Sequence, residues 1–201
     1  MGLQSLDSPV RIWVSPPKNP DCLCSRDFFV ICKTGGCRMD RKNQLLFLAL
    51  QYEKGHSRRS RHILSVLGLC EVIADGENLT QEERETVLAA AILHDIPIRY
   101  CKETYGDACQ ENQRREAVWI VPEFLQKAGY PPEAADRVLP LVLRHHCYEE
   151  TIDPLLQILM EADLLVNLLE GEPVSPAFAR RFFKTGTGRE LLEAVLSECG
   201  K

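Results

Sequence analysis

The chain has 201 residues, of which 45% are hydrophobic and 26% charged, and its formal net charge is −5 at pH 7. This length suits one large domain or one domain with an extension, and the charged fraction is ordinary for a soluble protein. The acidic balance disfavours binding to duplex nucleic acid, and no apolar run reaches the roughly 18 residues needed to span a membrane.

Residues 1–38 differ in composition from the rest of the chain. They contain several prolines and four of the nine cysteines, with little helical periodicity. We therefore expect an irregular extension here, and Met39 would also serve as a translation start. The cysteines could bind zinc, but their spacing is irregular and no histidine lies among them; they are Cys22, Cys24, Cys32 and Cys37. The N-terminus lacks a basic segment followed by an apolar one, so we expect a cytoplasmic protein without a secretory signal.

From Met39 onward, apolar residues recur at helical spacing. The predicted helices cover, in chain order, roughly residues 45–55, 58–75, 81–94, 116–127, 133–146 and 154–171, and two further segments that begin at Ser175 and Thr187. Thr80 and Glu83 form a capping-box pattern at the start of the third helix. Residues 40–200 show no convincing strand alternation, so we expect an all-α domain of about seven or eight helices over residues 39–201.

The pair His94-Asp95 closes an apolar, alanine-rich run over residues 87–93. An imidazole and a carboxylate at the end of a core-facing helix are unfavourable to bury without a partner. A divalent metal satisfies both, because His nitrogen and Asp oxygen are good ligands for ions such as Zn, Mn and Fe. His62, His145 and Asp163 also lie beside core residues of predicted helices. We expect the helices to bring these side chains together around an ion.

Three strings carry a family resemblance: SRHILSV around His62, AAAILHDI around His94-Asp95, and LMEADLLVN around Asp163. With this order of ligands, the chain resembles the HD superfamily of metal-dependent phosphohydrolases over about residues 43–198. The strings LVLRHH and FFKTGTGRELLEAVL are similar to those of small bacterial HD proteins. The resemblance implies an HD-like helical domain over residues 39–201. It also implies the metal ligands, which are His62, His94, Asp95 and Asp163.

Two positions depart from the family pattern. Many members have Gly or Gly-Lys shortly after the His-Asp pair, where this chain has Ile96-Pro97-Ile98. Members with two metals often carry a further histidine in the next helix. Gln113 falls at that position here, and glutamine is a poor ligand. His145 or His146 could still hold a second ion, but we expect one metal rather than two.

A His and Asp site with an open position can lower the pKa of bound water towards 7, so that hydroxide attacks phosphorus. We therefore expect hydrolysis of a small, nucleotide-like phosphate ester with a divalent ion drawn from Mn, Fe, Zn, Ni, Co and Mg. Asp95 would hold the ion and orient the water, and His145 or His146 would donate a proton or hydrogen-bond to the phosphate. Arg144 and Lys184 are the candidate phosphate-binding cations; Lys184 lies in a loop before a helix N-terminus.

Other interpretations share these residues. A catalytically idle HD domain that binds metal and an anionic ligand, as a sensor or scaffold, would keep the same ligands, and an HD-type lyase or oxygenase would need redox-active iron. The complete ligand set favours the hydrolase. Arg58, Arg59 and Arg61 precede His62, but each of them singly is explained as a solvated surface charge. The exposed side of residues 45–48 could pack on a second copy in a homodimer, although packing within the domain explains it equally well.

Overall fold

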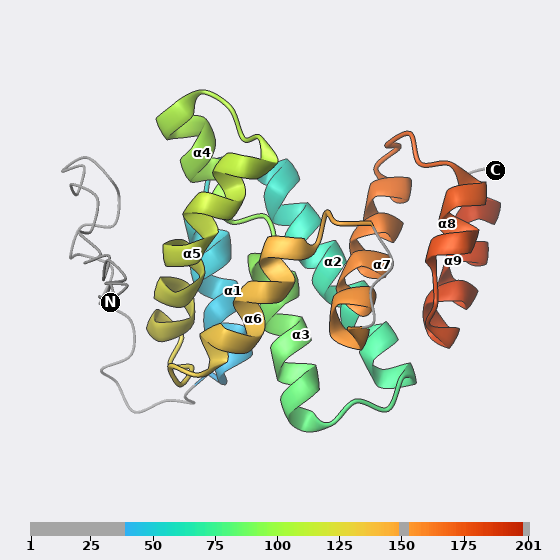
Figure 1. Ribbon diagram of the computed structural model, residues 1–201, viewed down its shortest axis with the longest axis horizontal. Helices are drawn as coiled ribbons and strands as arrows, with labels where there is room; N and C mark the ends of the chain where they lie inside the picture. Colours follow the sequence, from blue (N-terminus) through green and yellow to red (C-terminus); the bar gives the residue numbers. More distant parts are fainter. Residues whose placement is uncertain (1–38, 149–152, 199–201) are drawn as a thin grey trace, which may run out of the picture. The chain divides into compact units, whose positions relative to one another are not determined.

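The computed structural model describes residues 39–148 and 153–198 (Figure 1). This described part contains nine α-helices and no strand: α1 Arg41–Tyr52, α2 Ser57–Gly76, α3 Gln81–Leu93, α4 Pro97–Tyr105, α5 Gln110–Lys127, α6 Ala134–Arg144, α7 Pro154–Leu169, α8 Pro176–Phe182 and α9 Gly186–Glu198. The prediction of an all-α fold is therefore confirmed. The extension expected over residues 1–38, with its four cysteines, lies outside the described residues.

Local signals explain where the helices that carry the candidate ligands begin. The capping box before α3 is present, with Thr80 and Glu83 each bonding to the other's backbone. Asp153 caps α7 by accepting hydrogen bonds from the backbone N–H groups of Leu155 and Leu156. These caps satisfy backbone donors that would otherwise lack partners at the helix ends.

One helix is absent from the sequence-based prediction, and another begins earlier than expected. α4 has nine residues, starts with a proline in its first turn, and ends at Gly106, whose φ of 77° is left-handed. Its residues are mostly polar and make only about two and a half turns, so apolar spacing alone does not distinguish this helix from a loop. α5 begins at Gln110, whereas the sequence-based prediction began at residue 116. The prediction missed the first turns because they are polar and show no apolar periodicity.

The helices α2, α3 and α7 pack against one another in the middle of the domain (Figure 1). α4 and α5 lie at one end, and α8 and α9 at the other. The three alanines at positions 89–91 of α3 are fully buried, which lets neighbouring helices approach closely. Every residue from 156 to 166 of α7 is buried, so this helix is enclosed on all sides. That enclosed stretch carries two carboxylates, Glu161 and Asp163.

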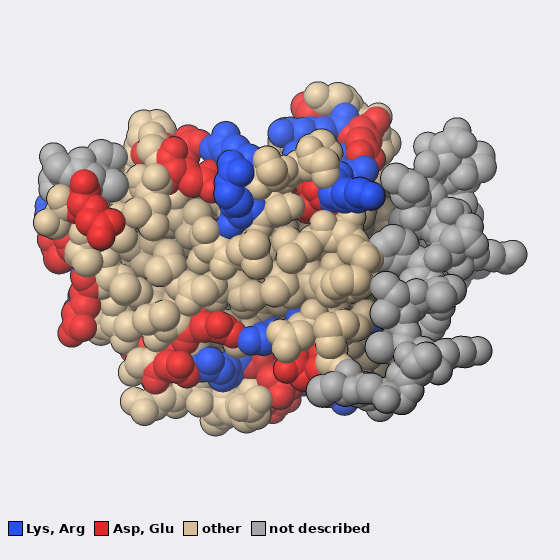
Figure 2. Space-filling view, turned by 180° about the vertical axis from the view of Figure 1, so that it is seen from behind, with Lys and Arg blue, Asp and Glu red and all other residues tan. Residues whose placement is uncertain are grey.

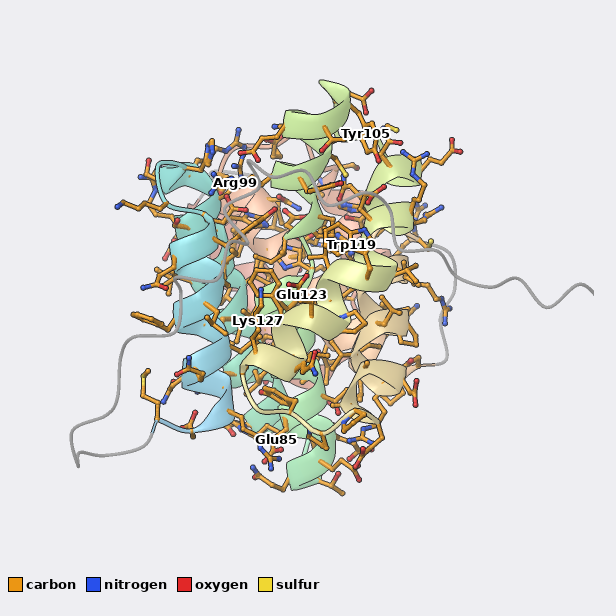
Figure 3. All side chains as sticks on the ribbon, turned by 90° about the vertical axis from the view of Figure 1, so that its left-hand side faces the viewer. Glu85, Arg99, Tyr105, Trp119, Glu123 and Lys127 are labelled. Atoms are coloured by element: carbon orange, nitrogen blue, oxygen red, sulfur yellow. The ribbon has the colours of Figure 1, made fainter. Side chains whose placement is uncertain are left out.

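The end of the domain formed by α4 and α5 is held by a polar cluster (Figure 3). The buried carboxylate of Glu116 accepts hydrogen bonds from the Tyr105 hydroxyl and the Trp119 indole, each at 2.7 Å. Glu123 and Lys127 follow Trp119 along α5 and form an ion pair of 2.7 Å.

Among the described residues, no helix is both long enough and apolar enough to cross a bilayer. On the face drawn in Figure 2, acidic and basic side chains lie along the margins, and a broad band across the middle shows neither. In α1, Leu45 is buried, Leu46 and Leu48 pack against the core, and Phe47 is 36% exposed. Packing within the domain thus accounts for most of this apolar segment, and the homodimer stays a prediction.

Candidate metal centre

Four helices direct imidazoles and carboxylates towards one point in the middle of the domain. His62 comes from α2, His94 and Asp95 follow α3, His145 and His146 follow α6, and Asp163 comes from α7. His94 and His145 each occupy the position directly after the last residue of their helix. The structure thus brings together the histidines and aspartates named as ligand candidates, although His62 and Asp163 lie 101 positions apart in the sequence.

A first group consists of four donor atoms. His62 Nε2 lies 3.1 Å from Asp163 Oδ1 and 3.8 Å from Asp95 Oδ2. His94 Nε2 lies 3.6 Å from Asp95 Oδ2 and 3.8 Å from Asp163 Oδ1. Two ligands bonded to one ion at about 2.1 Å lie roughly 3.0–3.5 Å apart in tetrahedral or octahedral geometry. The atoms of His62, His94 and Asp95 all lie within 4.8 Å of one another, so these three could hold a single divalent ion, and Asp163 Oδ1 adjoins both of the histidines.

Several buried atoms of the centre have no hydrogen-bond partner among the described residues. They are His94 Nε2, Asp95 Oδ1, His145 Nε2 and Asp163 Oδ2. The residues His94, His145 and Asp163 are only 1–3% exposed. Leaving such polar atoms unpaired in the interior is costly, and protein cores rarely do so. Four of the seven such atoms among the described residues belong to candidate ligands, which indicates that the centre can take a group that the chain itself does not supply.

The imidazoles are held through their other ring nitrogen. His94 Nδ1 lies 2.8 Å from the carbonyl of Ala91, and His145 Nδ1 lies 2.6 Å from the carbonyl of Val142, three residues earlier in each case. A carbonyl only accepts, so Nδ1 carries the proton and Nε2 keeps its lone pair. His62 differs, because both of its ring nitrogens face carboxylates: Nδ1 lies 3.3 Å from Glu170 Oε1 and Nε2 lies 3.1 Å from Asp163 Oδ1, so Nε2 must lose a proton before it can bind an ion. Outer contacts of this kind orient metal-binding histidines.

A second group shares one residue with the first. Asp95, His145 and His146 each offer a ligand atom within 4.8 Å of the others. Asp95 turns Oδ2 towards the first group, while Oδ1 lies 3.6 Å from His145 Nε2. Gln113 borders a cavity of about 10 Å³ beside His145 and His146, and its Oε1 is buried without a partner. Gln113, the residue expected to make binding of a second ion weaker, thus lies next to this second group.

Burial and the charges of the centre favour the ligand forms of Asp95, Asp163 and His94, but not that of His62. Burial alone would raise the pKa of Asp95, but the neighbouring histidines, His94 foremost, hold it below its ordinary value. Burial also opposes ionisation of Asp163, whose pKa the hydrogen bond from His62 lowers overall. The pKa of His94 is lowered by burial. Burial would likewise lower the pKa of His62, but the hydrogen bond to Asp163 and the charge of Asp95 outweigh it and raise this pKa to about 9.

An open cavity of about 480 Å³ reaches the centre from the surface. His62, Asp95 and Asp163 line it, together with His146, which is half-buried. His145 does not line this cavity, so His146 is the histidine of the pair that a substrate in the cavity would meet.

The two predicted phosphate-binding cations lie elsewhere. Arg144 is exposed at the end of α6 and lines neither cavity. Lys184 lines neither cavity, and its Nζ donates to the carbonyl of Arg181 at 3.0 Å. The basic side chains that do line the open cavity are Arg58, Arg59 and Lys102. Arg144 is adjacent to His145 in sequence but does not reach the cavity. Successive residues at a helix end point in directions about 100° apart around the helix axis.

The loop that contains Lys184 binds an anion, but the anion is internal. The backbone N–H groups of Lys184 and Thr185 donate to Glu161 Oε1 at 2.5 and 3.1 Å, and the Thr185 hydroxyl donates to Glu161 Oε2. Gln157 Nε2 donates to the same carboxylate at 2.8 Å. The expectation that this loop holds a substrate phosphate is therefore corrected, because a buried carboxylate already takes its donors at the N-terminus of α9.

The sequence-based reasoning missed Glu170 as the outer partner of His62. Glu170 lies seven residues after Asp163, which is two helical turns, so the i, i+7 spacing along α7 was a usable signal. It missed Lys102 because α4 itself was not predicted. Arg59 lies three residues before His62 on one face of α2, and this spacing also offered a signal.

The profile of the HD domain family matches residues 59–168, a little over half of the chain. All the residues that converge in the centre fall within this range. No curated protein and no solved structure matches the chain.

Proposed function

Since this chain belongs to the HD-domain family, we propose that it is a metal-dependent hydrolase of a small phosphate ester. The observation that carries the proposal is the convergence of donor atoms from His62, His94, Asp95 and Asp163; His94 Nε2 and the second carboxylate oxygens of Asp95 and Asp163 are buried without partners among the described residues. Two imidazoles with two carboxylates favour transition ions such as Mn, Fe, Co, Ni or Zn over Mg, which prefers oxygen ligands. When bound, such an ion supplies an activated water nucleophile and neutralises charge on the phosphoryl oxygens.

The chain's own residues divide the remaining work. Asp95 is 19% exposed at its side chain and borders the open cavity, so it can hold the ion and also orient a water molecule towards the substrate. His146 borders the same cavity and is placed to hydrogen-bond to a phosphoryl oxygen or to the leaving group. Glu170 keeps the His62 ring oriented through Nδ1.

The ion supported most directly by the geometry is the one at the first group. The second group has two imidazoles, the shared Asp95 and the neutral amide of Gln113. It therefore carries less negative charge than the first group, and a divalent ion would bind there more weakly.

The test combines metal analysis with hydrolysis. The purified chain is stripped of metal, loaded separately with Mn²⁺, Fe²⁺, Co²⁺, Ni²⁺, Zn²⁺ or Mg²⁺, and assayed on p-nitrophenyl phosphate and a panel of natural phosphate monoesters and diesters. We expect turnover with at least one transition ion, and its loss in Asp95→Ala. Arg144→Ala is the matched control, since Arg144 borders neither cavity.

Turnover that survives Asp95→Ala would overturn the mechanism. A stoichiometrically bound ion without turnover on any phosphate ester would instead support the idle, ligand-binding HD domain.

A further inference from the structure

The open cavity has a basic side that the proposed hydrolysis leaves without a role. Arg59, in the first turn of α2, and Lys102, in α4, line it together with the metal-binding side chains. Two cations beside a site for phosphate esters indicate an additional anionic ligand group, provided that their donors are not already used by the chain.

The side chain of Arg59 is held in place by the buried carboxylate of Glu53. Its Nε donates to Glu53 Oε2 at 2.7 Å, and Glu53 is only 1% exposed. The guanidinium has five N–H donors in a rigid fork, and this contact uses only one of them. Among the described residues, no acceptor lies within hydrogen-bond distance of the two terminal nitrogens. Arg59 is therefore fixed in place with its outer edge available to a ligand.

The neighbouring Arg58, in contrast, uses its N–H donors within the chain. It donates to Glu170 and to Glu172, with its closest contact at 2.8 Å, and its side chain is 69% exposed, against 19% for Arg59. The charge of Arg58 is thus neutralised within the chain. Lys102 has no ion pair among the described residues, so its ammonium group is available on the wall of the same cavity.

The basic side lies close to the metal centre. His62 follows Arg59 by three residues, so both side chains project from the same face of α2, about 4.5 Å apart along the helix axis. Ser57, at the start of α2, also lines the cavity, and no side chain caps this helix end. The positive end of a 20-residue helix therefore adds to the field of the two cations.

We propose that Arg59 and Lys102 bind a second phosphoryl group of the substrate, so that the enzyme acts on small molecules with two phosphoryl groups a few bonds apart. Glu53 is the positioning residue for Arg59. The N–H donors of Arg59 that Glu53 does not use and the ammonium group of Lys102 suit the oxygens of a phosphate monoester, whose charge is close to −2 near pH 7. The assignment rests on the proposed function, since the first phosphoryl group is taken to lie at the metal centre.

A matched pair of substrates tests the proposal: propane-1,3-diol phosphate and propane-1,3-diol bisphosphate, assayed with the metal-loaded enzyme. We expect the wild type to hydrolyse the bisphosphate with a kcat/KM about 10- to 100-fold higher, the range typical of a charge-assisted hydrogen bond. Arg59→Gln should abolish this preference through KM and leave the monophosphate within about threefold. Arg61→Gln, exposed on the same helix and outside the cavity, should behave as the wild type.

Two further variants separate positioning from folding. Arg59→Lys keeps the charge but loses the fork held by Glu53, so we expect an intermediate KM. Glu53→Gln should raise KM for the bisphosphate with kcat, metal content and the monophosphate values unchanged. A purely structural role would lower all of these values together.

A binding measurement makes the two proposals separable. Titration of the metal-free protein with inorganic phosphate should give a Kd that Arg59→Gln raises at least about 10-fold and Arg61→Gln leaves unchanged. If no ester is hydrolysed but this binding depends on Arg59, the anion site stands and the hydrolase proposal fails. Equal behaviour of Arg59→Gln and Arg61→Gln in both assays would overturn the second phosphoryl site.

Discussion

Glu161 and Asp163 lie on the same buried stretch of α7, and their residues are 0% and 2% exposed. Glu161 accepts hydrogen bonds from Gln157, from the Thr185 hydroxyl and from two backbone N–H groups. Asp163 receives one hydrogen bond, from His62, and its Oδ2 has no partner among the described residues.

The difference shows how one helix can use the same chemical group for two purposes. A carboxylate that the chain satisfies completely stabilises the fold and has no capacity left for a ligand. A carboxylate left partly unsatisfied stabilises the fold less, but it keeps a lone pair for an ion. The number of donors around each group, rather than its burial or charge, therefore separates the structural residue from the candidate ligand.

The strongest way to break this comparison is Asp163→Ala. We expect the Kd for Mn²⁺ to rise by more than about 100-fold, beyond the 10- to 100-fold typical for loss of an outer contact. The unfolding temperature of the metal-free protein should fall less than in Glu161→Gln, because the variant removes an orphaned oxygen together with a single hydrogen bond, the one from His62. Calorimetric titration and circular dichroism measure the two effects, and unchanged metal affinity would contradict the assignment of Asp163 as a ligand.

Glu161→Gln should show the opposite pattern. The amide keeps one acceptor but loses the charge and turns an NH₂ group towards backbone donors, so we expect the free energy of unfolding to fall by about 2 kcal/mol. Metal affinity should stay within about twofold. Urea unfolding of the metal-free proteins measures the loss, and a fully stable variant that loses its ion would reverse the roles assigned to the two carboxylates.

Gly188→Ala probes the same carboxylate from the other side. A Cβ on Gly188 would collide with Glu161 Oε2 and with the Thr185 hydroxyl, so it should destabilise the protein and spare the ion, as Glu161→Gln does.

A smaller effect is expected at Glu170, which contacts the metal centre only through the His62 ring. Glu170→Ala should raise the Kd for the ion by about 10-fold, the low end for an outer partner. Glu172→Ala is the matched control, because Glu172 pairs with the same Arg58 but not with His62. Equal Kd values for both variants would remove Glu170 from the centre.

The smallest expected effect is the pH dependence of metal binding. The pKa of His62 is about 9 without an ion, so the ring is protonated at pH 7 and must lose a proton to coordinate. Raising the pH from 7 to 8 should therefore strengthen metal binding, by up to about tenfold for one proton. Calorimetry in two buffers of different ionisation enthalpy measures the proton release, and binding that weakens between pH 7 and 8 would contradict this sign.

The comparison also marks where sequence-based prediction succeeded. Helix α2 and the start of α3 follow from apolar spacing and from the pair Thr80 and Glu83, because these signals act within a few residues. α4 was missed because its nine residues are mostly polar and make only about two and a half turns, too short a stretch for apolar spacing to distinguish a helix from a loop. The loop around Lys184 was interpreted as a phosphate site on its glycines and its helix start, which are the same features that a buried glutamate needs.

The sequence alone determined an all-helical domain, the family pattern, and the residue types suited to a divalent ion. Only the tertiary structure decided which carboxylate of α7 is satisfied internally, which cations reach the cavity, and that Asp95 faces two groups of ligands. The reason is physical: the state of a buried polar group depends on its nearest donors, and these come from remote segments. Asp163 meets a histidine 101 residues away, and Glu161 meets a loop 23 and 24 residues away.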